Sequence, residues 1–105
     1  MSEARKIFSY AEARALVPEV RRLTEAAYRA LAEAGLDPEQ PDRDQAREVL
    51  GRWAAAMQQR GLSVKGPWLV DFDNGAGYYC WRYPESGLLY WHSYTAGVAG
   101  RLPIQ

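Results

Sequence analysis

The spacing of apolar residues changes at Gly61, and this change constrains the fold more than any other feature of the chain. Before Gly61 the apolar residues recur about every 3.6 positions, which is typical of amphipathic helices. After it they alternate with polar residues, which is typical of strands. The chain has 105 residues, about the size of one domain. We therefore predict a single α+β domain over 1–105, with a helical half at about 9–60 and a β-rich half at about 62–105.

The helical half is predicted to begin with a short leading helix. Ser9 and Glu12 have the spacing of a capping box, so a helix begins near Tyr10. Pro18 lacks an amide hydrogen and clashes with the preceding turn. We expect the leading helix to end near Leu16 and a new helix to start at Pro18, because proline is favoured in a first turn.

Two longer helices are predicted to form a hairpin. The first ends at Gly35, because glycine accommodates a left-handed cap, and 36–41 contains two prolines and is expected to be a loop. Asp42 and Gln45 repeat the capping signature, and the second helix is predicted to run to about Arg60. A short connection makes the two helices antiparallel neighbours that cover one face of a sheet.

The β-rich half is predicted to form a small antiparallel sheet of three to four strands. Segments 62–65 and 68–72 alternate and are expected to be strands. Segments 78–83 and 88–93 flank Pro84-Glu85-Ser86-Gly87, a turn sequence with an early proline and a final glycine. The glycine-rich tail is expected to lie beside this hairpin.

The register expected for the hairpin decides which side chains share a face. With Tyr83 opposite Leu88, Cys80 pairs with Trp91, so that Cys80 and His92 lie on opposite faces. Both faces then carry large aromatic rings, and two helices can bury only one of them. We therefore expect the tail or a second copy of the chain to cover part of the other face.

Composition narrows the classes of partner. Thirteen Lys and Arg balance thirteen Asp and Glu, which argues against nucleic acid and anionic membranes as partners. Stacking of single-stranded nucleic acid on the aromatic rings remains a weaker alternative that requires a basic groove. One cysteine, no signal peptide and no apolar run of about 18 residues favour a cytoplasmic protein that does not span a membrane.

The chain lacks the motifs of common enzyme classes. It contains no Gly-x-Gly-x-x-Gly, Walker loop or Gly-x-Ser-x-Gly sequence, and one Cys with one His does not supply the usual zinc ligands. We therefore predict no cofactor and no metal site, and we lean towards a non-enzymatic role. Cys80 and His92 would form a nucleophile pair only on a shared face, which the predicted register does not allow.

Four polar residues of the β-rich half are the candidates for a site. His92 can transfer protons near neutral pH, and Asp71 on a neighbouring strand could orient it. Arg82 and Arg101 could bind the carboxylate or phosphate of a small anion. The structural alternatives are a hydrogen-bonded histidine at a sheet end, an ion pair between Asp71 and Arg82, and an arginine that anchors the tail.

Aromatic rings near these residues could stack on a ligand. The candidates are Trp81, Trp91 and Tyr79. The alternative for all three is a place in the core or in an interface.

Blocks of residues along nearly the whole chain resemble a known family. They are Phe8-Ser9-x-x-Glu12-Ala13, Leu16-Val17-Pro18-Glu19-Val20, Gly61-Leu62-Ser63-Val64-Lys65, Leu69-Val70-Asp71-Phe72, Cys80-Trp81-Arg82, Tyr90-Trp91-His92 and Ala96-Gly97-Val98-Ala99-Gly100-Arg101-Leu102-Pro103-Ile104. Together they resemble the bacterial family catalogued as domain of unknown function 2203. The sequence departs from that pattern at Tyr90 and Val98, where Phe is expected, and in its short helix connection. The family has no established activity, but the resemblance implies that Asp71, Arg82, His92 and Arg101 belong to one recurring pattern.

These observations favour a non-enzymatic binding or interaction module that acts as a homodimer. The alternative is a small-molecule-binding or catalytic site formed by Asp71, Arg82, His92 and Arg101. That alternative requires the four side chains to converge around a pocket.

Overall fold

The structure, a computed structural model, describes residues 6–41 and 44–105 and contains two helices and one sheet. The elements are α1 (Tyr10–Glu33), α2 (Asp44–Gln59), β1 (Ser63–Gly66), β2 (Leu69–Asp73), β3 (Gly77–Arg82), β4 (Tyr90–Ser93), the short 3-10 helix η1 (Val98–Gly100) and β5 (Leu102–Pro103). The sheet is antiparallel with the order β1-β2-β3-β4-β5. The predicted α+β class is confirmed, with five strands instead of three to four because the tail adds β5.

Helix α1 is continuous, so the prediction of a separate short leading helix is wrong. The capping box is present: the Ser9 hydroxyl accepts from the Glu12 amide, and the Glu12 carboxylate accepts from the Ser9 amide. Pro18 lies inside the helix with its side chain exposed. Arg14, whose carbonyl would accept the missing amide hydrogen, is also exposed, so water can replace that hydrogen bond.

The two helices end where glycines were expected to stop them. Gly35 and Gly61 both have positive φ angles, of 79° and 85°, which glycine adopts without steric cost. The predicted capping residue Asp42 lies outside the described residues, and the structure follows α2 from Asp44. No helix within 6–41 and 44–105 is long and apolar enough to cross a membrane.

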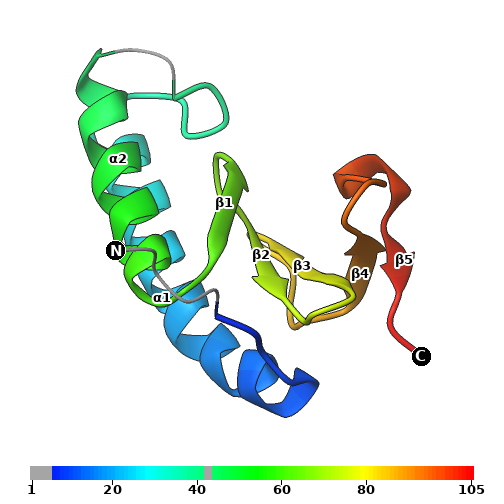
Figure 1. Cartoon of the computed structure of the whole chain (residues 1–105). Helices are drawn as coiled ribbons and strands as arrows, with labels where there is room; N and C mark the ends of the chain where they lie inside the picture. Colours follow the sequence, from blue (N-terminus) through cyan, green and yellow to red (C-terminus); the bar gives the residue numbers. More distant parts are fainter. Residues whose placement is uncertain (1–5, 42–43) are drawn as a thin grey trace, which may run out of the picture.

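The core lies between the two helices and one face of the sheet (Figure 1). Its largest fully buried side chains include Trp68 and Trp81 from the β-rich half. Trp68 was expected inside a strand, but it lies in the β1–β2 turn with φ 64°, and its indole N–H donates to the Pro38 carbonyl at 2.6 Å. Trp53 of α2 donates to the buried Thr24 hydroxyl of α1 at 2.8 Å, which ties the two helices together.

The register of the β3–β4 hairpin differs by one residue from the prediction. Cys80 lies opposite Tyr90, where Trp91 was expected. The connection is longer than a four-residue turn, because Arg82 and Glu85 exchange hydrogen bonds and the β3–β4 ladder stops at the Cys80–Tyr90 pair. A shift of one residue turns every side chain of one strand to the other face relative to its partner strand.

Strand β5 places the tail beside β4, as expected. Leu102 pairs with Trp91, and the amide of Ile104 donates to the carbonyl of Leu89 at 2.8 Å. Figure 1 shows that β4 and β5 lie furthest from the two helices. The helices therefore cover the first strands of the sheet and leave the last two uncovered.

Candidate functional site

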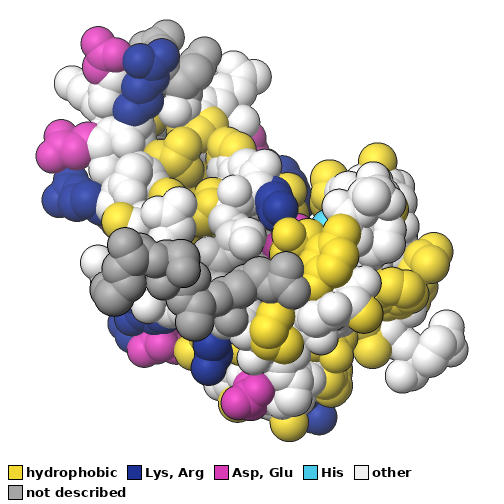
Figure 2. Space-filling model, viewed as in Figure 1, with side chains coloured by type: hydrophobic (Ala, Val, Ile, Leu, Met, Phe, Trp, Pro, Cys, Tyr) yellow, Lys and Arg dark blue, Asp and Glu magenta, His cyan; other side chains and the backbone are white. Residues whose placement is uncertain are grey.

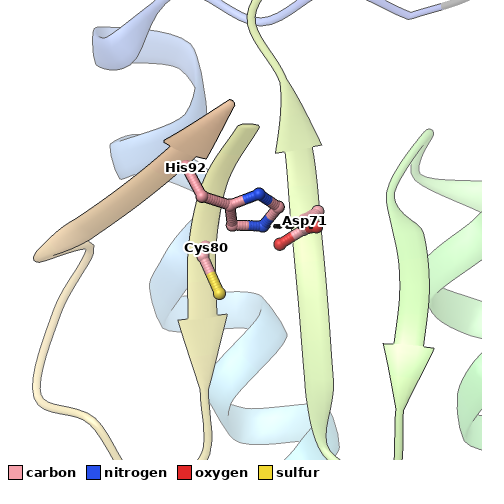
Figure 3. A group of neighbouring side chains, drawn as sticks. All are labelled: Asp71, Cys80 and His92. Atoms are coloured by element: carbon pink, nitrogen blue, oxygen red, sulfur yellow. Dashed lines mark hydrogen bonds and ion pairs between the residues drawn. The ribbon is translucent and has the colours of Figure 1, made fainter. Parts of the chain in front are cut away.

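Three polar side chains meet on the sheet face that points away from the helices. Asp71 of β2 pairs directly with Cys80 of β3, and His92 of β4 lies two residues beyond the partner of Cys80. Figure 3 shows His92 and Asp71 pointing toward each other, with the Cys80 side chain beside them on the strand in between. The prediction that Cys80 and His92 lie on opposite faces is therefore wrong, because it rested on the incorrect register.

This cluster is buried. The exposed fractions of Asp71 and Cys80 are 0%, and that of His92 is 4%. The chain has one histidine, and Figure 2 shows a small part of it, in cyan, at the bottom of a narrow notch in the surface. The cluster therefore lies under a thin cover of neighbouring side chains instead of in an open pocket.

The hydrogen bonds of His92 fix where its protons lie. Nδ1 is 2.8 Å from the carbonyl oxygen of Ser93, which can only accept, so Nδ1 carries a hydrogen and donates it. Nε2 is 2.9 Å from Oδ2 of Asp71. One more proton must lie between these two atoms, either on an imidazolium or on a carboxylic acid, because two lone pairs would otherwise face each other. The pair therefore holds one shared proton and has no net charge.

Burial also sets the protonation of the other groups. Burial raises the pKa of Asp71, and the charges of His92 and Lys65 act against that rise. The Oδ1 atom of Asp71 is buried and has no hydrogen-bond partner among the residues that the structure describes. Burial, together with the neighbouring Asp71 carboxylate, raises the pKa of Cys80 to about 12. Cys80 is therefore a neutral thiol at pH 7, which is not the state of an activated nucleophile.

Two basic side chains flank the cluster. The guanidinium carbon of Arg101 lies 4.1 Å from the centre of the Tyr90 ring, and its Nη1 is 3.7 Å from Sγ of Cys80. Arg101 also forms an ion pair with Glu85. On the other side, Nζ of Lys65 lies 4.4 Å from the centre of the Tyr78 ring. Both cations thus rest on aromatic rings, and Glu85 balances the charge of Arg101.

The structure brings three of the four predicted polar residues together. Asp71 and His92 are in direct contact, and Arg101 reaches them through Cys80. Arg82 does not join the cluster; it lies at the end of β3, where its Nη2 donates to Glu39 at 3.1 Å. The structural alternative of an ion pair between Asp71 and Arg82 is not found either, because Asp71 bonds to His92 and Arg82 to Glu39.

The three predicted aromatic residues lie on the helix-facing side of the sheet, away from His92. Trp81 is fully buried in the core, opposite Val70. Tyr79 packs edge-to-face against Tyr10 of α1. Trp91 is opposite Tyr79 and is 37% exposed.

Sequence reasoning did not identify Cys80, Tyr90 and Lys65 as neighbours of Asp71 and His92. The Asn74-Gly75 sequence signalled a hairpin, but a two-residue turn there would place Asp71 opposite Tyr78. The observed Asp71–Cys80 pair belongs to a hairpin centred between Gly75 and Ala76, so the turn sequence alone did not give it. The signal for Cys80 beside His92 was absent, because it depends on the length of an irregular connection.

No curated protein and no solved structure matches this chain. A family model matches residues 29–104, a range that contains α2, the whole sheet and every residue of the cluster. The chain therefore belongs to the family described as "Uncharacterized conserved protein (DUF2203)".

Proposed function

We propose that the chain is a non-enzymatic interaction module of the cytoplasm that forms a homodimer through the uncovered part of its sheet. The observation that carries this proposal is a row of apolar side chains across four strands. The row follows the register from Phe72 through Tyr79 and Trp91 to Leu102. Phe72 is fully buried under the helices, whereas Trp91 is 37% and Leu102 54% exposed.

The exposed end of this row forms what we call the open sheet patch. It consists of Tyr10, Tyr79, Leu89, Trp91 and Leu102. Contiguous exposed apolar surface on a small protein marks an interaction site. Leu102 lies in β5, and Leu89, directly before β4, accepts a hydrogen bond from the Ile104 amide, so the patch continues the core face beyond the edge of the helical layer.

A second copy of the chain is the partner that fits this patch best. The formal net charge is zero, so two copies do not repel each other. A two-fold dimer needs only one self-complementary surface, and a flat apolar patch meets that requirement. Strand β5 has two residues, one of them Pro103, and offers an incoming strand little backbone for pairing. Contact therefore involves the faces of the two sheets and not their edges.

Light scattering coupled to gel filtration tests this proposal. The wild-type chain of 11.9 kDa is expected to elute with twice that mass at about 100 μM, and Leu102→Glu is expected to elute as a monomer. Val98→Glu is the matched control, because Val98 is also an exposed apolar residue but lies in η1, outside the patch. A monomeric wild type, or equal loss of the dimer in both variants, would refute the proposal.

A site for a small anion is the weaker candidate. Its two arginines are already engaged, Arg82 by Glu39 and Arg101 by Glu85. An anion would have to displace a carboxylate from either of them.

A further inference from the structure

We propose that Asp71, Cys80 and His92 form a site for one divalent transition-metal ion, with Zn²⁺ the best match to the donor set. The inference is independent of the homodimer. The sequence-based expectation of no metal rested on the presence of one Cys and one His, which are too few for a zinc site built from those residues alone. A carboxylate can serve as a third ligand, and the structure places Asp71 beside Cys80 and His92.

The geometry carries the proposal. A thiol sulfur, an imidazole nitrogen and a carboxylate oxygen lie within 4.8 Å of one another. Ligand atoms that share a tetrahedral zinc ion lie about 3.3 to 3.8 Å apart, as its bond lengths of about 2.0 to 2.3 Å require. Small side-chain rotations therefore bring the three donors to one ion. They come from three adjacent strands, which fixes their backbone positions.

The orientation of His92 matches that of a metal-binding histidine. Such a histidine usually donates its other ring N–H to a backbone carbonyl or a carboxylate, which fixes the ring and its tautomer. His92 donates from Nδ1 to the carbonyl of Ser93, and its Nε2 faces Asp71. The nitrogen that would bind the ion is thus the one that the backbone leaves available.

The second independent observation is the unused acceptor on Asp71. Its Oδ1 is buried and lacks a hydrogen-bond partner within 6–41 and 44–105. A buried carboxylate oxygen without a partner is costly, and binding to a cation is one of the few ways to satisfy it. Asp71 has no exposed surface, so bulk water does not supply that partner.

The charges in the cluster balance a divalent ion. A Cys80 thiolate and an Asp71 carboxylate together supply two negative charges. Binding would displace two protons, one from the thiol and one from the His92–Asp71 pair, and the local net charge would stay unchanged. Arg101 adds no uncompensated charge, because Glu85 neutralises it. The Lys65 ammonium rests on the ring of Tyr78. Three protein ligands leave the fourth position for water or another ligand.

Cobalt(II) is the probe for this site, because its absorption reports both coordination geometry and sulfur ligation. Titration of the metal-free protein is expected to give one Co²⁺ per chain, with a thiolate charge-transfer band and the visible bands of a tetrahedral ion. An equivalent of Zn²⁺ is expected to displace it, as zinc commonly binds such donors more tightly. Cys80→Ser is expected to abolish the charge-transfer band, and Asp71→Asn to weaken binding by at least about tenfold.

Asp73→Asn is the matched control, because Asp73 is also buried and lies two residues along the same strand. It is expected to bind Co²⁺ with unchanged stoichiometry and spectrum, and circular dichroism checks that each variant is folded. A titration of the wild type without stoichiometric binding would overturn the proposal. A charge-transfer band that survives in Cys80→Ser would overturn it as well.

X-ray absorption of the zinc-loaded wild type tests the site without any variant, in case Cys80→Ser does not fold. The expected first shell has one sulfur at about 2.3 Å and the remaining nitrogen and oxygen ligands at about 2.0 Å. A shell without sulfur would place the ion elsewhere and refute the assignment.

Discussion

Arg101 is the side chain that fastens the C-terminal segment to the sheet, and Arg101→Ala is expected to loosen it. The residue lies between η1 and β5, where it pairs with Glu85, stacks on Tyr90 and contacts Cys80. Its substitution removes all three contacts at once. We expect both a less stable protein and a more accessible Cys80.

The loss of stability follows from the burial of the pair. The side chains of Arg101 and Glu85 are 23% and 17% exposed, so their interaction falls between an exposed ion pair, about 0 to 1 kcal/mol, and a fully buried one, whose disruption costs about 3 to 5 kcal/mol. The cation–π contact with Tyr90 adds about 0.5 to 1 kcal/mol. We expect Arg101→Ala to lower the free energy of unfolding by about 2 to 3 kcal/mol.

Urea unfolding measures this change, and Arg82→Ala is the control. Arg82 also pairs with a glutamate, Glu39, but the two side chains are 46% and 43% exposed. That variant is expected to lose less than about 1 kcal/mol. Equal losses in the two variants, or a loss below about 0.5 kcal/mol in Arg101→Ala, would refute the reasoning.

Alkylation of Cys80 provides the second readout. The thiol is buried and its pKa is raised to about 12, so at pH 8 it reacts with iodoacetamide only when the structure opens locally. The reaction is expected to be faster in Arg101→Ala than in the wild type and unchanged in Arg82→Ala. An unchanged rate in Arg101→Ala would mean that the C-terminal segment does not cover Cys80.

Two further predictions concern the contact between α1 and α2 and the pairing of β3 with β4. Thr24→Val keeps the shape of the side chain but leaves the buried Trp53 N–H without its acceptor. We expect this variant to lower the free energy of unfolding, measured in urea, by about 1 to 3 kcal/mol. Thr24→Ser keeps the hydroxyl and is expected to lower it clearly less. A Cβ atom at Gly77 would lie 2.5 Å from the backbone oxygen of His92, so Gly77→Ala is expected to disturb the β3–β4 pairing and to cost about 1 to 3 kcal/mol. Gly87→Ala, where nothing lies within 4 Å, is the control, and equal melting temperatures for the two alanine variants would contradict this account.

The helical half was largely predictable because its signals are local. The capping box of Ser9 and Glu12 and the final Gly35 act within a few residues of the helix ends, and both lie where the sequence placed them. Pro18 is the exception. Its effect on a helix depends on whether the preceding carbonyl faces water, and that is decided by how the whole helix packs.

The candidate site was only partly predictable, because it depends on non-local pairing. Asp71 and His92 were identified by residue type, and their contact is present. Arg82 was assigned to the same site but pairs with Glu39 of a distant loop. Cys80 was set aside because an assumed turn length placed it on the wrong face.

The sequence by itself determined the α+β class, the helix start after Ser9, the helix ends before Gly35 and Gly61, and the concentration of aromatic rings in the sheet, because periodicity and capping are properties of neighbouring residues. The tertiary structure alone decided the register of β3 and β4. Since side chains alternate across a strand, that one-residue difference determines which groups meet. It brings a thiol, an imidazole and a carboxylate together in the interior and leaves Trp91 and Leu102 at the surface.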